Sequence, residues 1–403
     1  MKRIKRNMNS LLALFWKRIP SEMLKIRKLF YLLFMAELIL PFGAIQMAIR
    51  SGYINLLAWC FAFILFTVIP IIEHIIGVDS THAINDLKES QEKYSYYSIL
   101  TFLCVPSVIV LSLYSALFFS DTPGLNWIGR IGWMITIGIC IAALALCAAH
   151  ELIHRKALLE RLVGGFLLAF VCHSDFMVVH IRGHHAKVAT PSDSSSARFG
   201  QSLYHFLLQS YRYTTAHAWV LEKEKLNRRG YSAFSWRNEL IWWNALSIVL
   251  GTTYYFYFGP LGLVFFVGQG FVAITAHHII NYFQHYGLRR CKLENGKYEK
   301  FTPKHAWGSN FLFSDVLTFH MPRHADHHLN PRRCYQDLRH CDESPQMPLG
   351  YLGMFLLSLI PSLWFKVMNS RVLEHQKEHS AKHDQIEYGD GNPSFHPGSE
   401  SRL

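Results

Sequence analysis

The sequence has few charged residues. Asp, Glu, Lys and Arg make up 17% of its 403 residues, whereas soluble domains contain about 25%. Hydrophobic residues account for 51% and aromatic residues for 14%. This balance argues against a soluble globular enzyme and favours a membrane protein. A net charge of +12 would also suit nucleic-acid binding, but membrane proteins concentrate Lys and Arg in their cytoplasmic loops.

The cysteines also lack a functional pattern. There are eight, none forms a C-x-x-C pair, and most lie within apolar runs. That absence argues against a thiolate-bound iron or zinc site and against a disulfide scaffold. We interpret the cysteines as reduced packing residues. No internal repeat is visible, so the chain is not predicted to be a repeat protein.

Six apolar runs are each close to the roughly 20 residues that a helix needs to cross the hydrocarbon layer. They span residues 29–49, 53–72, 97–119, 128–149, 240–257 and 260–280. Short turns at 50–52, 120–126 and 257–262 would join them into three hairpins. The apolar stretch 162–172 is too short to cross, and 351–368 is interrupted by Pro361, so we expect both to be interfacial or packed helices.

Basic residues lie almost entirely on one side of this predicted topology. Of the 40 Lys and Arg residues, 38 fall outside the apolar runs and their short turns, and only Arg50 and Arg130 lie near the other side. The positive-inside rule therefore places both termini and all long loops in the cytoplasm. We predict an all-α fold: an integral bundle of six transmembrane helices, in an inner (cytoplasmic) membrane, with a histidine-rich cytoplasmic cap.

The pattern divides the chain into three parts. Residues 1–28 form a basic segment that we interpret as a retained cytoplasmic N-terminus, because no small-residue cleavage site follows it. Residues 29–372 form the membrane-embedded domain. Residues 373–403 are polar and contain Gly, Ser and Pro, so we expect a largely disordered tail.

Histidines are the residues that suggest chemistry. Positions i, i+3 and i+4 of a helix share one face, and His324, His327 and His328 have that spacing. Neutral imidazole binds Fe, Zn, Cu and Ni. Nine histidines in four groups on the predicted cytoplasmic side are candidate ligands: His150, His154, His180, His184, His185, His285, His324, His327 and His328. Nine exceeds what one ion can use, so we predict two metal ions.

Other polar residues are weaker candidates. Metal-bound histidine usually donates its second N–H to an acceptor, and Glu151, Asp193 and Asp326 lie beside candidate ligands. The alternative for each is an ordinary salt bridge. His320 is expected to support the ligands rather than to bind metal. Eight further histidines are expected to be structural or, in the tail, not to be ligands: His173, His205, His277, His278, His305, His375, His379 and His383.

A second hypothesis is a membrane zinc metalloprotease. His150-Glu-Leu-Ile-His154 satisfies H-E-x-x-H, in which two histidines bind zinc and the glutamate acts as base. This hypothesis needs only one further ligand and leaves the other histidine groups unexplained. A carboxylate-bridged di-iron bundle would need a second Glu-x-x-His and two more inward glutamates, and the sequence has no matching set.

The histidine motifs resemble those of the membrane-bound alkane monooxygenases, in the wider membrane desaturase/hydroxylase superfamily. The resemblance extends from about Pro70 to Met368. Its motifs are His150-Glu-Leu-Ile-His154-Arg, His180-Ile-Arg-Gly-His184-His185 followed by Ala189-Thr-Pro-Ser-Asp193, Asn281-Tyr-Phe-Gln-His285-Tyr-Gly-Leu, and Pro322-Arg-His324-Ala-Asp-His327-His328. Three positions differ from the common pattern: Val179 replaces Glu, Ile153 replaces Gly, and Arg155 replaces Lys.

The resemblance implies that the nine imidazoles hold two irons, which activate O2 for insertion into an unactivated C–H bond. The expected reaction converts the terminal methyl of a medium-chain n-alkane into a primary alcohol. Electrons would come from rubredoxin, reduced by rubredoxin reductase. Xylene-type hydroxylases share much of the pattern, so a xylene-type or fatty-acyl substrate stays open. Candidate docking residues for the electron donor are Arg289, Arg290, Arg332, Arg333 and Arg339.

Overall fold

The computed structural model describes residues 31–32, 36–78 and 96–380. Within these ranges the chain is helical and has no named strand, only three isolated bridges. The predicted all-α class is therefore confirmed for the described residues. The basic segment 1–28 and the end of the tail, 381–403, lie outside them.

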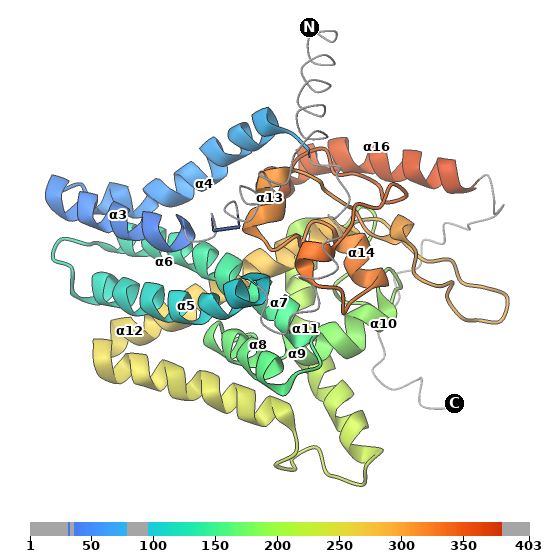
Figure 1. Ribbon diagram of the computed structural model, residues 1–403, viewed down its shortest axis with the longest axis horizontal. Helices are drawn as coiled ribbons and strands as arrows, with labels where there is room; N and C mark the ends of the chain where they lie inside the picture. The colour runs from blue at the N-terminus through green and yellow to red at the C-terminus, as the bar shows by residue number, and fades with distance from the viewer. Residues whose placement is uncertain (1–30, 33–35, 79–95, 381–403) are drawn as a thin grey trace, which may run out of the picture.

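Long helices form a bundle at one end of the molecule (Figure 1). Their order is α3 Ala36–Ser51, α4 Ile54–Ile76, α5 Tyr96–Asp121, α6 Trp127–Ile141, the π-helical segment η2 Ala142–Leu146, α7 Cys147–Ile153 and, later in the chain, α12 Glu239–His285. The breaks after α3 and α5 coincide with the predicted turns 50–52 and 120–126. At the second turn Asn126 caps α6, because its side chain accepts a hydrogen bond from the Gly129 amide.

Three described helices are long and apolar enough to cross a membrane: Tyr96–Asp121, Trp127–Ile153 and Glu239–His285. The third contains both the fifth and the sixth predicted spans. By contrast, α3 has only 16 residues, and within α4 the apolar part is the shorter stretch Cys60–Ile76. A membrane protein follows from these helices, whereas the count of six spans stays a prediction.

Helix α12 is broken at Gly259, whose backbone has φ 68° and ψ −166°, immediately before Pro260. The two halves pack on each other: the rings of Tyr254 and Phe266 lie 4.9 Å apart between centroids. This break occurs inside the predicted turn 257–262. The conformation at Gly259 is one that essentially only glycine adopts, so a single residue lets the chain reverse between two apolar helices.

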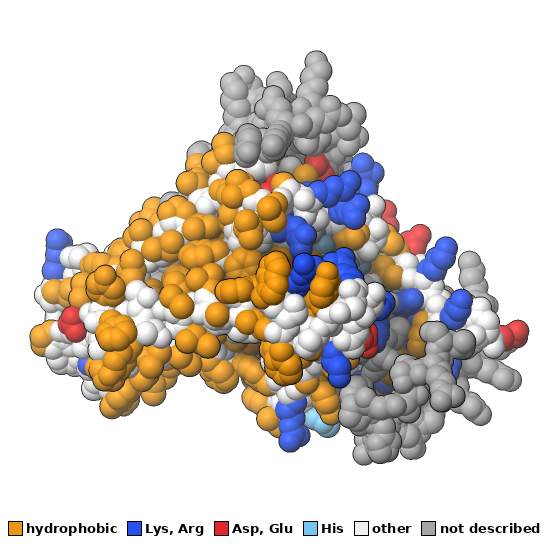
Figure 2. All heavy atoms as spheres, turned by 90° about the horizontal axis from the view of Figure 1, so that it is seen from below, with side chains coloured by type: hydrophobic (Ala, Val, Ile, Leu, Met, Phe, Trp, Pro, Cys, Tyr) orange, Lys and Arg blue, Asp and Glu red, His pale blue; other side chains and the backbone are white. Residues whose placement is uncertain are grey.

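Loops and further helices, most of them short, make up the other end of the molecule (Figure 1). They are α8 Leu158–Phe170, α9 Phe176–Val178, the π segment η3 Val179–His184, α10 His185–Lys187, α11 Leu203–Asn227, η4 Pro303–His305, α13 Leu312–Leu317, α14 His324–Leu329, η5 Tyr335–Asp337, α15 Tyr351–Ser358 and α16 Pro361–Ser380. Figure 2 shows a continuous apolar surface over the bundle and Lys and Arg side chains gathered at the opposite end.

The two short apolar stretches behave as expected, but the tail does not. The stretch 162–172 lies mostly in α8, which has 13 residues, and 351–368 is divided between α15 and α16 at Pro361. However, α16 continues to Ser380, so the expected disorder from 373 is wrong for residues 373–380. Packing explains the extension: Val372 is fully buried, and a Cβ added at Gly287 would lie 2.9 Å from its Cγ2.

The backbone at Gly259 provides a test of the α12 break. Replacing Gly259 with Ala should lower the free energy of unfolding by roughly 1–3 kcal/mol, because a Cβ strains this backbone conformation. The measurement is the unfolding midpoint of the purified protein. Gly43→Ala is the control: Gly43 lies within α3, and a methyl group added there would have no neighbouring atom within 4 Å, so this change should be neutral or stabilising. Equal effects of the two changes would contradict the proposed strain.

Candidate metal centre

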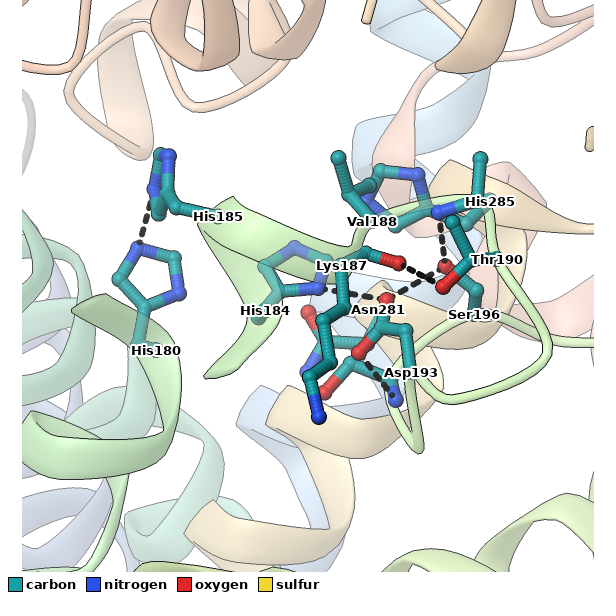
Figure 3. A network of polar contacts seen from close by, with 12 residues as sticks. His180, His184, His185, Lys187, Val188, Thr190, Asp193, Ser196, Asn281 and His285 are labelled. Carbon is teal, nitrogen blue, oxygen red and sulfur yellow. Dashed lines mark hydrogen bonds and ion pairs between the residues drawn. The ribbon is translucent and has the colours of Figure 1, made fainter. Parts of the chain in front are cut away.

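Two of the four histidine motifs are carried by, or follow, π-helical segments. His150 lies in α7 and His154 caps its end, directly after η2. The second motif forms η3, in which hydrogen bonds run from i to i+5. His180 and His185, five residues apart, therefore face one another, with their Nε2 atoms 3.1 Å apart. Figure 3 shows this pair and, beside it, His184 directed the other way.

We name the first set of side chains the first imidazole group: His150, His154, His180, His185 and His327. Four of them, all except His185, place a ligand atom within 4.8 Å of each other. His185 joins through its Nε2, which is 3.1 Å from the Nε2 of His327. The Nε2 atoms of His154 and His180 are 2.9 Å apart. Three separate segments of the chain thus direct imidazole nitrogens at one point.

The second imidazole group consists of His184, His285, His324 and His328, whose ligand atoms also lie within 4.8 Å of each other. All four side chains are buried. Nε2 of His324 is 2.9 Å from that of His285 and 3.0 Å from that of His328. Nε2 of His184 is 3.1 Å from that of His328. Helix α14 supplies ligands to both groups, so the two groups adjoin.

The donor set fits metal ions. Two imidazoles bound at about 2.1 Å and at right angles to one ion have nitrogens about 3.0 Å apart, close to the separations in both groups. Neutral imidazoles alone do not explain the arrangement, because each Nε2 carries either one hydrogen or one lone pair. Several Nε2 atoms directed at one point fit a cation that accepts all their lone pairs. All nine predicted ligands are thereby brought into two groups of five and four.

Burial lowers the pKa of most of these imidazoles and so keeps them neutral. It lowers the pKa of His154 to about 4, with the nearby His184 adding to the effect. Burial, followed by the neighbouring imidazoles, also holds the pKa values of His327 and His328 well below the ordinary value. A neutral imidazole offers its lone pair to a metal without first losing a proton. The groups are thus prepared for cation binding at neutral pH.

Asp193 orients one imidazole of the second group. Its Oδ2 lies 2.9 Å from Nδ1 of His184 and accepts a hydrogen bond of 2.6 Å from the Ser196 hydroxyl (Figure 3). Burial alone would raise the pKa of Asp193, but His184 and Ser196 hold that pKa below its ordinary value. The ionised carboxylate accepts the Nδ1 hydrogen of His184, so the lone pair is left on Nε2, the atom directed at the second group.

The other three supporting candidates bond elsewhere. Glu151 accepts hydrogen bonds from Arg155 and from the Tyr335 amide. Its neighbour His150 faces the first group. Because successive residues of a helix are rotated by about 100°, Glu151 points away from that group. Asp326 pairs with Arg333 at 2.6 Å. The expectation that Glu151 and Asp326 orient imidazoles is therefore not met by their observed bonds, which are salt bridges, the stated alternative.

His320 does not extend the α14 helix. It lies in a turn with φ 55°, and its Nε2 is 2.7 Å from the Tyr31 hydroxyl. The tail histidine His375 lies apart from both groups, with its Nε2 3.0 Å from the Lys304 carbonyl oxygen. His379 and His383 have no described side chains.

Two contacts near the centre were not anticipated. Nδ1 of His285 is 3.4 Å from the backbone carbonyl of His305, and no residue type signals a backbone acceptor. Phe176 stacks on the ring of His180 at 4.6 Å and meets the ring of His277 at 4.4 Å. His277 in turn lies 3.2 Å from His173. Two of the expected structural histidines, His173 and His277, therefore form a buried polar pair that Phe176 separates from the first group.

A helical chain with membrane-length apolar helices and two adjoining imidazole groups has the features of a membrane histidine-cluster enzyme. The fatty acid desaturase family model matches residues 125–358. Alkane 1-monooxygenase 1 of Pseudomonas aeruginosa is 44% identical over 355 residues, covering 88% of this chain and 93% of the relative. Alkane 1-monooxygenase 2 of the same organism is 43% identical and covers 81% and 86%. The chain belongs to the alkane 1-monooxygenase family.

A more distant relative bears on substrate choice. The hydroxylase component of a xylene/toluene monooxygenase from Pseudomonas putida is 32% identical over 240 residues, covering 57% of this chain and 62% of the relative. Both kinds of relative are named as monooxygenases. They differ in the hydrocarbon that their names state.

Asp193→Asn should weaken metal retention by roughly 10 to 100-fold, because the amide is a poorer acceptor for the His184 Nδ1 hydrogen. Metal content after dialysis against graded chelator measures the effect. Asp326→Asn is the matched control, since Asp326 bonds Arg333 and Asn330 rather than an imidazole. Its metal retention should stay close to that of the unchanged protein. A larger loss for Asp326→Asn than for Asp193→Asn would contradict the assigned role of Asp193.

Proposed function

We propose that this protein is a di-iron monooxygenase that hydroxylates the terminal methyl of medium-chain n-alkanes to primary alcohols. The observation that carries the proposal is the pair of adjoining imidazole groups, of five and four histidines. The names of the relatives support the reaction and the alkane. In this proposal the first imidazole group holds one iron and the second holds the other.

The two irons, when bound, supply the redox chemistry that activates O2. The protein's own contribution lies in the side chains around them. Nine imidazoles would provide the ligand atoms, and Asp193 fixes the orientation of His184. Phe176 packs over His180 and lies 6.3 Å from the ring of His150, so an apolar wall borders the first group. Such a wall excludes water from the place where a C–H bond must react.

The proposed location is the inner membrane, with six spans and both termini and the active site facing the cytoplasm. The apolar surface of the bundle and the basic surface at the opposite end support this orientation (Figure 2). A medium-chain alkane dissolves in the bilayer. We therefore propose that the substrate enters from the lipid, between the apolar faces of the helices, without crossing water.

Two alternatives make different predictions. A xylene-type or fatty-acyl substrate would use the same irons, and the xylene/toluene relative supports keeping that option. A zinc metalloprotease would need Glu151 as general base, but its carboxylate is held by Arg155 and the Tyr335 amide. That hypothesis also leaves most of the nine imidazoles without a role.

Purified protein reconstituted in membranes should contain two irons per chain. With octane, reduced rubredoxin and 18O2 it should form labelled 1-octanol. His328→Ala should abolish this product and lower the iron content, because Nε2 of His328 contacts two other imidazoles of the second group. His375→Ala is the control and should retain activity, because His375 bonds the Lys304 carbonyl instead.

Three outcomes would count against the proposal. Label in toluene-type or fatty-acyl products but not in octane would reject the alkane assignment while keeping the iron site. About one zinc and no iron per chain would favour the metalloprotease. Loss of activity in His375→Ala equal to that in His328→Ala would contradict the separation of ligands from tail histidines.

The electron donor is proposed to be rubredoxin, reduced in turn by rubredoxin reductase. Of the five candidate docking arginines, Arg289, Arg332 and Arg339 are exposed. The other two are engaged: Arg290 donates to the Glu299 carbonyl, and Arg333 pairs with Asp326. Docking at the three exposed arginines would require an acidic surface on the donor, and the attraction would weaken as salt screens the charges.

Changing Arg289, Arg332 and Arg339 together to Glu should slow reduction by rubredoxin at least tenfold at low ionic strength. Stopped-flow reduction measured from low to high salt checks this. Arg50→Glu is the control, because Arg50 is exposed at the turn between α3 and α4, at the other end of the bundle. A reduction rate that ignores both salt and the triple change would reject docking at this surface.

A further inference from the structure

A cavity lies where α11 ends and α12 begins. Its volume is about 450 Å³, and its lining residues are Lys225, Leu226, Arg229, Tyr231 and Arg237. None of these residues belongs to either imidazole group. The family's metal chemistry therefore does not account for this cavity, which we call the α11–α12 cavity.

The acidic residues nearest this cavity are already neutralised. Glu222, fully buried, and Glu239 bind two cations between them. Arg182 donates to both carboxylates at 2.5 and 2.9 Å, and Lys225 does so at 3.0 and 2.9 Å. The two carboxylates thus balance the charges of Arg182 and Lys225. The other two basic residues that line the cavity add positive charge that these carboxylates do not balance.

These two residues are Arg229 and Arg237. Both are exposed, and no carboxylate of the described part of the chain forms an ion pair with either. Arg237 is held in place: its guanidinium carbon lies 4.1 Å from the centre of the Tyr231 ring and 5.1 Å from that of Trp236. Its Nη1 donates to the Tyr231 hydroxyl at 2.5 Å. A guanidinium ordered in this way keeps further N–H donors, in a planar arrangement that matches phosphate oxygens.

Large apolar side chains surround the same place. Phe234 is 82% exposed, Trp236 70% and Trp242 59%. The Trp242 indole N–H donates to the Trp236 backbone carbonyl at 2.6 Å, so the Trp242 ring is held against the segment that precedes α12. Tryptophan exposed at the end of a membrane-length helix is typical of the lipid headgroup level. Beyond them α12 continues with exposed apolar residues such as Ile248.

We propose that the α11–α12 cavity binds the phosphate headgroup of an anionic diacyl lipid. Arg229 and Arg237 bind the phosphate, the aromatic rings lie at the depth of the glycerol, and the acyl chains follow the exposed apolar face of α12. Two uncompensated guanidiniums next to three exposed aromatic side chains favour a ligand that is anionic at one end and apolar at the other. A free phosphate would leave the aromatic rings without a partner.

The test uses the full-length protein in nanodiscs of phosphatidylcholine, to which phosphatidylglycerol is added in steps. Retained lipid is counted by native mass spectrometry, and the thermal midpoint is recorded in parallel. We expect selective retention of phosphatidylglycerol by the unchanged protein and at least a tenfold weaker retention by R229Q/R237Q. The matched control is K292Q/K297Q, which removes the same charge from two exposed lysines away from the cavity and should bind like the unchanged protein.

Other results would overturn the proposal. Equal weakening in both double variants would mean general attraction between a basic surface and an anionic membrane. Sodium phosphate or glycerol phosphate that raises the thermal midpoint as much as the lipid would mean a site for a free anion. Because R229Q/R237Q could fail to fold, its metal content is compared with that of the control, and R237K serves as a second variant. Lysine keeps the charge but loses the stacked planar donors, so R237K binding as tightly as the unchanged protein would also contradict the proposed role.

Discussion

The structure depends on one constraint: nine buried or half-buried imidazoles must direct ring nitrogens at two neighbouring points. Burying so many polar groups is unfavourable unless each finds a partner, and contacts of about 3 Å between Nε2 atoms leave too few hydrogens to satisfy them all. The backbone around the motifs is irregular for the same reason. The π segments η2 and η3 precede or contain ligands, and Ala189, Phe319 and His320 adopt positive φ close to them. Such conformations cost of order 1 kcal/mol or more each.

The sequence singled out the nine histidines that the structure brings together, but not how they divide between the two groups. Spacing of i, i+3 and i+4 places His324, His327 and His328 on one face of α14, and the structure bears this out with a short helix. The same rule cannot separate His327, in the first group, from His324 and His328, in the second. That separation depends on η3, where an i to i+5 pattern pairs His180 with His185 and frees His184 for the other group. A π segment has no signal in composition or spacing, so the division of the histidines between the two groups could not be predicted from the sequence.

The expectation that carboxylates beside the histidines orient them was met only in part, for a related reason. Asp193, Glu151 and Asp326 each lie close to a ligand in sequence, yet only Asp193 bonds one in the structure. Which partner a carboxylate finds depends on segments that arrive from far along the chain. Glu151 meets the Tyr335 amide, 184 residues away, and the same loop supplies Arg333 to Asp326. The turn within α12 could be predicted from the sequence, because Gly259 and Pro260 are local turn signals within an apolar run.

Charge explains why the centre lies where the bundle ends. Two divalent cations bound only by neutral imidazoles would carry a charge of about +4, which is costly to hold deep in hydrocarbon. In this structure the ligands come from the ends of α7 and α12 rather than from mid-helix positions. One ionised carboxylate, Asp193, is bonded to the ligand set, so it offsets only part of such a charge. In the proposed di-iron centre, such a charge would favour the arrival of electrons, since each one would lower it. The position of the histidines at the helix ends leaves the side towards the bundle for apolar side chains such as Phe176, which packs on His180. A cation-binding surface and an apolar surface therefore meet at the same few side chains.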